Sequence, residues 1–390
     1  MVANQAGSRG PAARSPYWEG RSAPGGGRLH EVREGRVWLR ALLGVVGVVV
    51  SAALLSTVFF RWSFAGGALS LTQRFPLRRF WAELPSQLPW LLPFIACSAA
   101  IIPLRALQWQ EALPRKVPFR ERYHLVAISA FANNTIPGKL GEVVRAFLLS
   151  RTQRIPFLSA VGSIAVCKIL ETAALVLLVA ASFVGPFGGI TRRFAGPLWI
   201  GIAAVLALML LVIVVAQHAP RMAAALHRRN HMHRTQELLA SIGEGLGAAR
   251  SVRGMAVLFV LSIGPVVAPA LGYGLGLRAL GIPGGLLGGS VVLGAIALGQ
   301  TAVGVPAGLG IYYFVTSWVA RSLGASPEQA AAYAFLTHLG TIAAQVGLGG
   351  ISVWRRGIRL RDLRRRTGQA KEELRHVPEE ADAVLERQPV

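Results

Sequence analysis

Residues 157–184 read FLSAVGSIAVCKILETAALVLLVAASFV. An α-helix needs about 20 mostly apolar residues to cross the hydrocarbon core of a bilayer. This stretch exceeds that length and carries only two charged residues, Lys168 and Glu171. It therefore predicts a transmembrane helix that holds a pair of charges inside it.

The composition of the whole chain agrees with that prediction. Of its 390 residues, 53% are apolar and only 15% are charged, and the mean hydropathy is +0.48. A soluble chain normally carries about 25% charged residues, so most of this chain belongs in hydrocarbon. We predict an all-α fold, a polytopic transmembrane helix bundle of about eight spans. The clear candidates for spans are Ala41–Phe60, Leu88–Leu104, Phe157–Val184, Pro197–Ala216, Met255–Leu275, Gly285–Val303 and Gln329–Trp354.

Two further segments, Tyr123–Leu149 and Val303–Leu323, are interrupted by proline and glycine. A continuous lipid-facing helix through such a site would leave backbone groups without partners, so both are predicted to be broken or re-entrant. Both interruptions have the pattern aliphatic–Pro–small–x–Leu–Gly, at Ile136–Gly141 and at Val305–Gly310. Matching breaks in two halves of a chain are typical of transporters with a site near the midplane, although chance similarity is an alternative. The residues that mark the broken elements are Pro137, Gly138, Pro306, Gly308 and Gly310.

Basic residues give the chain a formal charge of +23, and they gather in the tails and between the apolar runs. That distribution indicates membrane topology and excludes nucleic-acid binding as the explanation for the charge. We predict a disordered basic cytoplasmic tail over 1–40, a transmembrane domain over 41–354, and a basic to mixed-charge cytoplasmic tail over 355–390. Arginines after the first span argue for the opposite orientation, but the overall bias favours cytoplasmic termini. The expected location is the plasma (inner) membrane. The excess of arginine over lysine indicates a GC-rich genome, which suggests a bacterial source.

Charged residues inside the predicted spans are the main candidates for function. All acidic residues between 41 and 354 are glutamates, and only Glu142 and Glu171 fall within embedded segments. Each has a cation three residues away, Arg145 and Lys168, at a spacing that allows pairing on one helix face. Intramembrane charges are costly and mark functional sites by default, yet they equally serve as pairs that lock helices together.

A helix is expected to begin near Gly141, directly after the proline and glycine. The start of a helix presents unpaired N–H groups and a positive dipole end to an anion, such as a lipid phosphate. Lys139 and Arg145 would add charge there, and Asn134 would add a side-chain amide. The predicted lipid-headgroup site therefore consists of Asn134, Lys139, Gly141, Glu142, Arg145, Lys168 and Glu171.

The run Asn134-x-x-Pro137-Gly138-x-x-Gly141-Glu142-x-x-Arg145 resembles the signature of the lysylphosphatidylglycerol synthase/flippase-like membrane domain. The resemblance covers roughly residues 40–355 and implies lipid translocation between leaflets. Two other motifs of the family are degraded here. In the span that resembles Glu-Arg-x-x-Asp, Cys167 stands in place of the first acid, while Lys168 and Glu171 keep the cation and the second acid by type. In the motif after Pro306, Tyr313 stands in place of the acid. The soluble aminoacyl-transferring domain is not expected after Trp354, so lysyl transfer is not expected either.

These observations favour a flippase-like transporter of an anionic or phosphate-bearing lipid, of the phospholipid or polyprenyl-phosphate type. An integral-membrane enzyme with Glu142 or Glu171 as general base is one alternative. A non-transporting scaffold that binds an acidic partner or anionic lipid is another. We predict no cofactor, no catalytic residue and no metal site, because His227, His231 and His233 have no carboxylate or cysteine near them.

Overall fold

The computed structural model describes residues 49–65, 68–73, 77–136, 140–182, 243–302 and 309–358, with scattered positions between 200 and 241. The side chains of residues 61–84 and 301–309 lie outside this description, as do both tails up to residue 48 and from residue 359. One antiparallel hairpin joins β1 (Phe60–Ala65) to β2 (Ala68–Gln73), with Phe60 opposite Gln73. Every other described element is helical, so the all-α membrane bundle is confirmed.

Four described helices are long and apolar enough to cross a membrane. They are α2 (Leu77–Ala112), α5 (Phe157–Ala181), α9 (Val252–Ala279) and α12 (Pro327–Arg355). The helix Val49–Phe59 and α10 (Gly285–Ala302) are shorter and also apolar. Most of the predicted span Pro197–Ala216 lies outside the described residues. The number of about eight spans therefore stays a prediction.

Helix α2 is longer than the sequence predicted. It contains four prolines, of which Pro103 is the last, and continues past the predicted end at Leu104 as far as Ala112. Prolines are tolerated within membrane helices because neighbouring helices and side chains satisfy the freed backbone groups. This extension brings Arg105, which was not among the charged residues predicted to be embedded, into the bundle.

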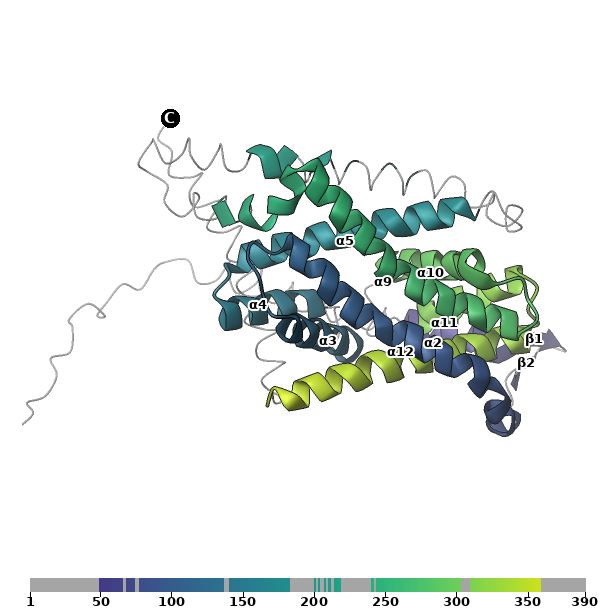
Figure 1. Ribbon diagram of the computed structural model, residues 1–390. Coiled ribbons are helices and arrows are strands. Elements are labelled where there is room, and N and C mark those ends of the chain that lie inside the picture. Colours follow the sequence, from purple (N-terminus) through teal and green to yellow (C-terminus); the bar gives the residue numbers. More distant parts are fainter. Residues whose placement is uncertain are drawn as a thin grey trace, which may run out of the picture. The chain divides into compact units, whose positions relative to one another are not determined.

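The break predicted within Tyr123–Leu149 is confirmed, because one helix, α3 (Phe119–Thr135), ends there and a second helix, α4 (Gly141–Gln153), begins. Arg356 Nη2, directly after α12, is 2.6 Å from Glu121 Oε2 in the first turn of α3. The start of α3 therefore lies beside the end of α12. The end of α4 lies at the same end of the bundle (Figure 1). The α3–α4 hairpin therefore enters and leaves at one end, which we call the α4 end.

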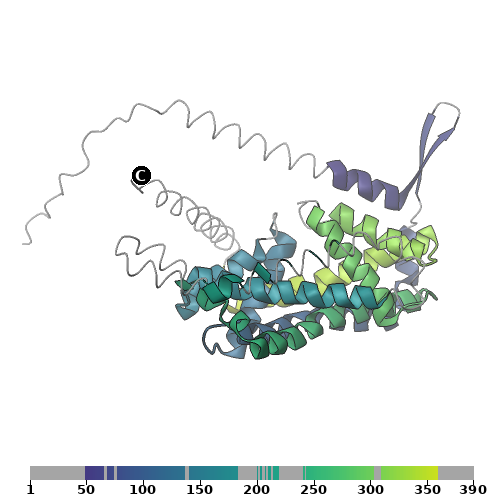
Figure 2. The same ribbon diagram turned by 90° about the horizontal axis from the view of Figure 1, so that it is seen from above.

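A second helical hairpin is formed by α10 and α11 (Leu309–Ser322). Its start and finish lie at the opposite end, which we call the α11 end (Figures 1 and 2). There Ser317 Oγ, near the end of α11, donates to the Ala330 carbonyl at the start of α12. Gly310 is the second residue of α11, whereas Pro306 and Gly308 lie outside the described residues. The two similar Pro–Gly segments thus belong to hairpins that enter the bundle from opposite ends.

Each end of the bundle has its own apolar core. At the α4 end the core surrounds Trp109, Ile128, Leu149 and Leu170, which come from α2, α3, α4 and α5. At the α11 end the fully buried side chains include Phe94 of α2, Leu277 of α9, and Tyr333 and Leu336 of α12. Helices α2, α9 and α12 each contribute buried residues to both cores, so these long helices join the two hairpins.

Candidate functional site

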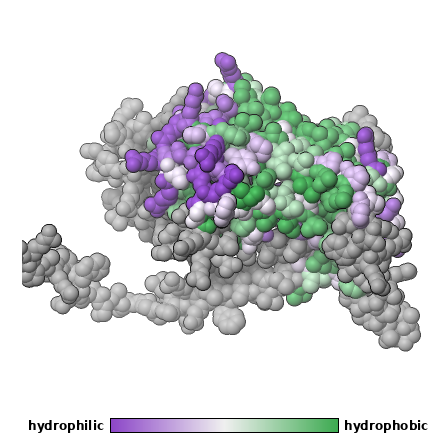
Figure 3. Space-filling view, turned by 60° about the horizontal axis from the view of Figure 1, so that its bottom comes forward, coloured by the Kyte–Doolittle hydropathy of each residue, from purple (hydrophilic) through white to green (hydrophobic). Residues whose placement is uncertain are grey.

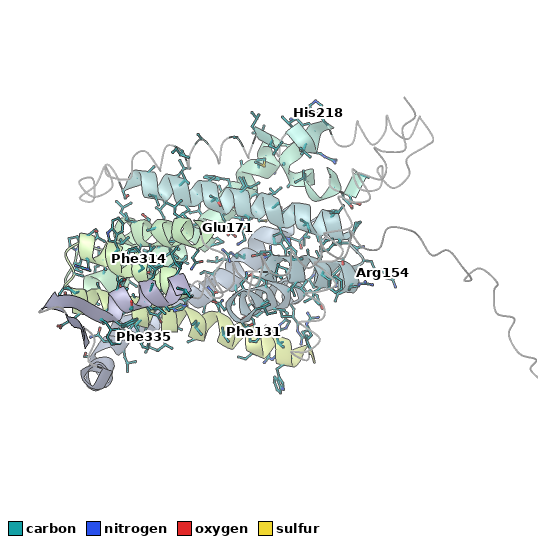
Figure 4. All side chains as sticks on the ribbon, turned by 180° about the vertical axis from the view of Figure 1, so that it is seen from behind. Phe131, Arg154, Glu171, His218, Phe314 and Phe335 are labelled. Carbon is teal, nitrogen blue, oxygen red and sulfur yellow. The ribbon has the colours of Figure 1, made fainter. Side chains whose placement is uncertain are left out.

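Five charged side chains meet beside the middle of α5. Three helices supply them: Arg105 comes from α2, Glu142 and Arg145 come from α4, and Lys168 and Glu171 come from α5. Figure 4 labels Glu171 on the side of α5 that faces the neighbouring helices. We call these five residues the charge network. Four of them are residues that the sequence predicted to lie in a lipid-headgroup site.

The strongest pair in the charge network joins α2 to α5. Arg105 donates from Nε to Glu171 Oε1 at 3.0 Å and from Nη2 to Glu171 Oε2 at 2.8 Å. A two-point arginine–carboxylate pair fixes both distance and orientation, because two parallel hydrogen bonds must form together. Glu171 is consequently held in one orientation at the centre of its helix.

Lys168 connects this pair to α4. Its ammonium Nζ donates to Glu171 Oε2 at 3.2 Å and lies 3.4 Å from Glu142 Oε1. On the far side of Glu142, Arg145 Nη2 lies 3.2 Å from Oε2. The two pairs predicted from i,i+3 spacing are therefore confirmed, and Lys168 bridges them. Glu142 therefore lies next to Arg145 and Lys168, and Glu171 lies next to Arg105 and Lys168.

The members of the network differ in exposure. The Arg145 side chain is 3% exposed and its guanidinium lies over the Trp109 ring, 4.3 Å from the centroid. The Arg105 and Lys168 side chains are 29% and 35% exposed. Three cations against two carboxylates leave one positive charge when all five are ionised. That surplus charge is accessible on Arg105 and Lys168, and an anion of single charge would neutralise it.

One buried donor in the network has no hydrogen-bond partner among the described residues. It is Arg145 Nε, and the neighbouring Glu142 Oε2 is likewise without a hydrogen bond despite its ion pair. Such groups are rare in folded proteins because an unsatisfied buried polar atom costs about 1–3 kcal/mol. The network thus contains one donor atom and one acceptor atom that its internal hydrogen bonds do not use.

The start of α4 is more tightly packed than the sequence suggested. The Gly141 N–H donates to Asn133 Oδ1 at 2.8 Å, so one of the N–H groups expected to face an anion is already occupied. A Cβ at Gly141 would overlap the Ser129 carbonyl oxygen and lie 2.7 Å from the Asn133 side chain. Glycine is required here because the backbones of α3 and α4 cross without room for a side chain.

Asn134 points elsewhere. Its Nδ2 donates to Gln345 Oε1 of α12 at 2.8 Å and to its own helix at Ala130. Within the described residues, Asn134 is therefore a link from the α3–α4 turn to α12, and its contacts are not with the charge network. Lys139, Pro137 and Gly138 lie outside the described residues.

The comparisons with known proteins agree with this architecture. The family model described as the lysylphosphatidylglycerol synthase TM region matches residues 44–349, which is well over half of the chain. The chain belongs to this family. No curated protein and no solved structure matches the chain. Membership of the lysylphosphatidylglycerol synthase TM region family confirms the resemblance and the integral-membrane nature of the chain.

Tyr313, where the resemblance led us to expect an acid, lies in an aromatic cluster of the α11 end. Its ring centroid is 5.5 Å from that of Phe59 and 5.1 Å from that of His338. His338 also stacks on Tyr312 at 4.5 Å, and Tyr312 Oη lies 3.0 Å from Tyr273 Oη. The contacts of Tyr313 among the described residues are therefore ring contacts and not those of an acid. The charge network is thus confined to the α4 half of the pair of hairpins.

Sequence reasoning missed Arg105, Asn133 and Gln345. The predicted span ends at Leu104, so Arg105 lies outside it, although a helix continues readily through one charged residue. The position of Arg105, two residues beyond Pro103 and directly after an apolar run, is a signal in the sequence that points to it. The contacts of Asn133 and Gln345 depend on how helices pack, so their sequence neighbourhoods carried no signal.

Among the described residues, no group of three or more His, Cys, Asp or Glu side chains could hold a metal ion. His227, His231 and His233 lie outside those residues. Cys167 and Cys97 are both free thiols, one buried and one partly buried.

Proposed function

We propose that this chain moves an anionic or phosphate-bearing lipid from one leaflet of the membrane to the other. The observation that carries the proposal is the surplus positive charge of the network, partly exposed on Arg105 and Lys168 beside the middle of α5. A cation at that depth is costly unless it faces a polar path, and lipid headgroups are the ligands that such a path would carry. Membership of the family supports the same reading.

The two hairpins supply the second line of support. Transporters with broken elements that enter from opposite sides place the substrate near the midplane and open to each side in turn. Here the α3–α4 hairpin carries Glu142 and Arg145, whereas Lys168, which contacts Glu142, belongs to the long helix α5. A movement of the hairpin relative to α5 would therefore stretch the Lys168–Glu142 contact of 3.4 Å, since it joins α4 to α5 within the network.

The proposed orientation places the α4 end in the cytoplasm of a bacterial plasma membrane. Hydrophilic residues gather at this end in the space-filling view, and an apolar surface follows beyond them (Figure 3). The exposed basic side chains at this end include Arg115, Lys116, Arg120, Arg151, Arg154 and Arg355. Cytoplasmic loops carry an excess of lysine and arginine, so the charge bias favours this orientation.

Translocation is tested with the full chain in liposomes that contain a fluorescent phosphatidylglycerol. The variant is Lys168→Gln, which keeps a polar side chain but removes the surplus charge. The initial rate of translocation is expected to fall about tenfold, the loss expected for one charge-assisted contact of about 1.4 kcal/mol. Arg278→Gln is the matched control, because Arg278 is an exposed cation at the end of α9 with no ion pair among the described residues.

Equal rates of translocation in wild type and in folded Lys168→Gln would contradict the assignment of the headgroup site to the charge network. Lipid that is chemically changed instead of moved would favour the alternative, an enzyme that uses Glu142 or Glu171 as a base. Lipid that is neither moved nor changed would favour the scaffold. Thin-layer separation of the recovered lipid distinguishes these two outcomes.

A further inference from the structure

A small cavity at the α11 end lies far from the α4 end of the bundle. It has a volume of about 220 Å³ and is lined by Thr57, Val58, Phe314, Ser317, Trp318, Arg321 and Pro327. These residues come from the first described helix, from α11 and from the first residue of α12. Figure 4 labels Phe314 at this end and Arg154 at the other. The cavity is separate from the charge network, since it contains none of the five network residues.

One face of α11 forms most of the cavity. Phe314, Trp318 and Arg321 follow one another at i, i+4 and i+7, so they lie along one stripe of the helix. Phe314 is 38% exposed and Trp318 is 43% exposed. Arg321 stands one residue from the end of α11, and Phe314 lies about 10 Å deeper along the helix axis. The stripe therefore runs from a cation at the helix end to an aromatic ring inside the apolar zone.

The charge of this stripe is not compensated within the described residues. Arg321 is exposed and has no ion pair with any described acid, including Glu328 in the first turn of α12. The remaining polar groups are satisfied locally: Thr57 Oγ1 donates to Leu54 and Ser317 Oγ donates to Ala330. The start of α12 is also closed, because Ser326 and Gln329 form a reciprocal capping box. Arg321 is consequently the group left to contact a ligand.

The order cation, tryptophan, apolar ring matches the order of groups in a phospholipid at a membrane surface. Tryptophan is enriched at the headgroup level, and arginine at a helix end contacts anionic headgroups. The volume is below the roughly 300 Å³ of typical small-molecule sites, which suits a phosphate and the first part of a chain but not a whole ligand. Charge complementarity selects a lipid with a net negative headgroup.

We propose that this cavity is a binding site for one anionic phospholipid of the leaflet at the α11 end. Arg321 contacts the phosphate, and one acyl chain lies along Phe314 and Val58. The site holds its lipid at a fixed position and does not depend on translocation. It would therefore persist in a chain whose transport activity had been abolished.

The test measures lipid binding to the full chain in detergent by native mass spectrometry, with dioleoyl phosphatidylglycerol as the probe and dioleoyl phosphatidylcholine as its zwitterionic control. Wild type is expected to retain one more phosphatidylglycerol than Arg321→Gln, whose dissociation constant for that lipid should rise about tenfold. Arg321→Lys should keep most of the binding. Arg278→Gln, which removes an exposed cation outside the cavity, should leave binding unchanged.

Three outcomes would overturn the proposal. The first is unchanged phosphatidylglycerol binding in Arg321→Gln, and the second is an equal loss in Arg278→Gln. The third is displacement of the lipid by millimolar inorganic phosphate, which would assign the cavity to a free anion. A Phe314→Ala variant guards against misfolding of the arginine variant. It should weaken binding of phosphatidylglycerol severalfold while leaving the preference over phosphatidylcholine intact, and unchanged binding there would contradict the acyl-chain contact.

Discussion

Arg105 on α2 and Glu171 on α5 form a two-point ion pair, with nitrogen–oxygen distances of 3.0 and 2.8 Å. The two residues are separated by 66 positions in the chain. Their pairing ties α2, one of the long helices that join both cores, to the helix that carries the centre of the charge network. The pair therefore has a structural role whether or not the network binds a lipid.

Removal of one partner is expected to destabilise the chain. Glu171→Gln leaves Arg105 and Lys168 without their shared carboxylate, while Glu142 continues to neutralise Lys168. We expect a loss of about 1–3 kcal/mol in the free energy of unfolding, since the partly buried guanidinium of Arg105 loses its charged acceptor. Denaturation in a mixed-micelle titration measures it. The double variant Arg105→Gln/Glu171→Gln should lose less stability than the two single variants lose together. A double loss equal to that sum would contradict the pairing.

Gly141→Ala is expected to disrupt the α3–α4 crossing. The added Cβ would overlap the Ser129 carbonyl oxygen, which belongs to backbone and cannot move away as a flexible side chain would. A loss of about 2 kcal/mol or more in stability is expected from the forced backbone shift. Gly247→Ala is the matched control, because a Cβ at Gly247 meets no atom within 4 Å. Thermal unfolding of both variants, followed by size-exclusion chromatography, should show a lowered transition only for Gly141→Ala.

The hydrogen bond between Asn134 and Gln345 is expected to couple the α3–α4 turn to α12. Their amides meet at 2.8 Å across two helices, and neither is fully buried. A double-mutant cycle with Asn134→Ala and Gln345→Ala should give a coupling energy of about 0.5–1.5 kcal/mol, the range found for interhelical hydrogen bonds in membranes. A coupling energy of zero would mean that the two side chains do not interact in the membrane.

The orientation can be read from single cysteines. In a background with Cys97 and Cys167 replaced by alanine, a cysteine at the exposed position Arg154 marks the α4 end, and one at Ser322 marks the α11 end. With the α4 end in the cytoplasm, a membrane-impermeant maleimide added to intact cells should label Ser322→Cys alone. Permeabilised cells should show both labelled. Labelling of Arg154→Cys in intact cells would reverse the orientation that we propose.

Local features of the sequence were sufficient to predict the charged pairs. The Lys168–Glu171 and Glu142–Arg145 pairs follow from i,i+3 spacing, which any helix converts into proximity. The break after α3 followed from proline and glycine in the same way, because their effect on a helix is local. The end of α2 was misplaced, since a hydropathy window stops at the first charge whereas a helix does not. That error concealed Arg105, the one member of the network that the sequence did not predict.

What the sequence by itself determined was therefore the helical membrane character of the chain, the break between α3 and α4, and the charged pairs within a turn. The tertiary structure alone decided that α3–α4 and α10–α11 enter from opposite ends, and that Lys168 bridges Glu142 to Glu171. It also decided that Asn134 reaches Gln345 and not the charge network. The physical reason is that spacing along one helix sets which residues share a face. Which faces then meet depends on how helices rotate and pack against each other, and that is a property of the whole bundle.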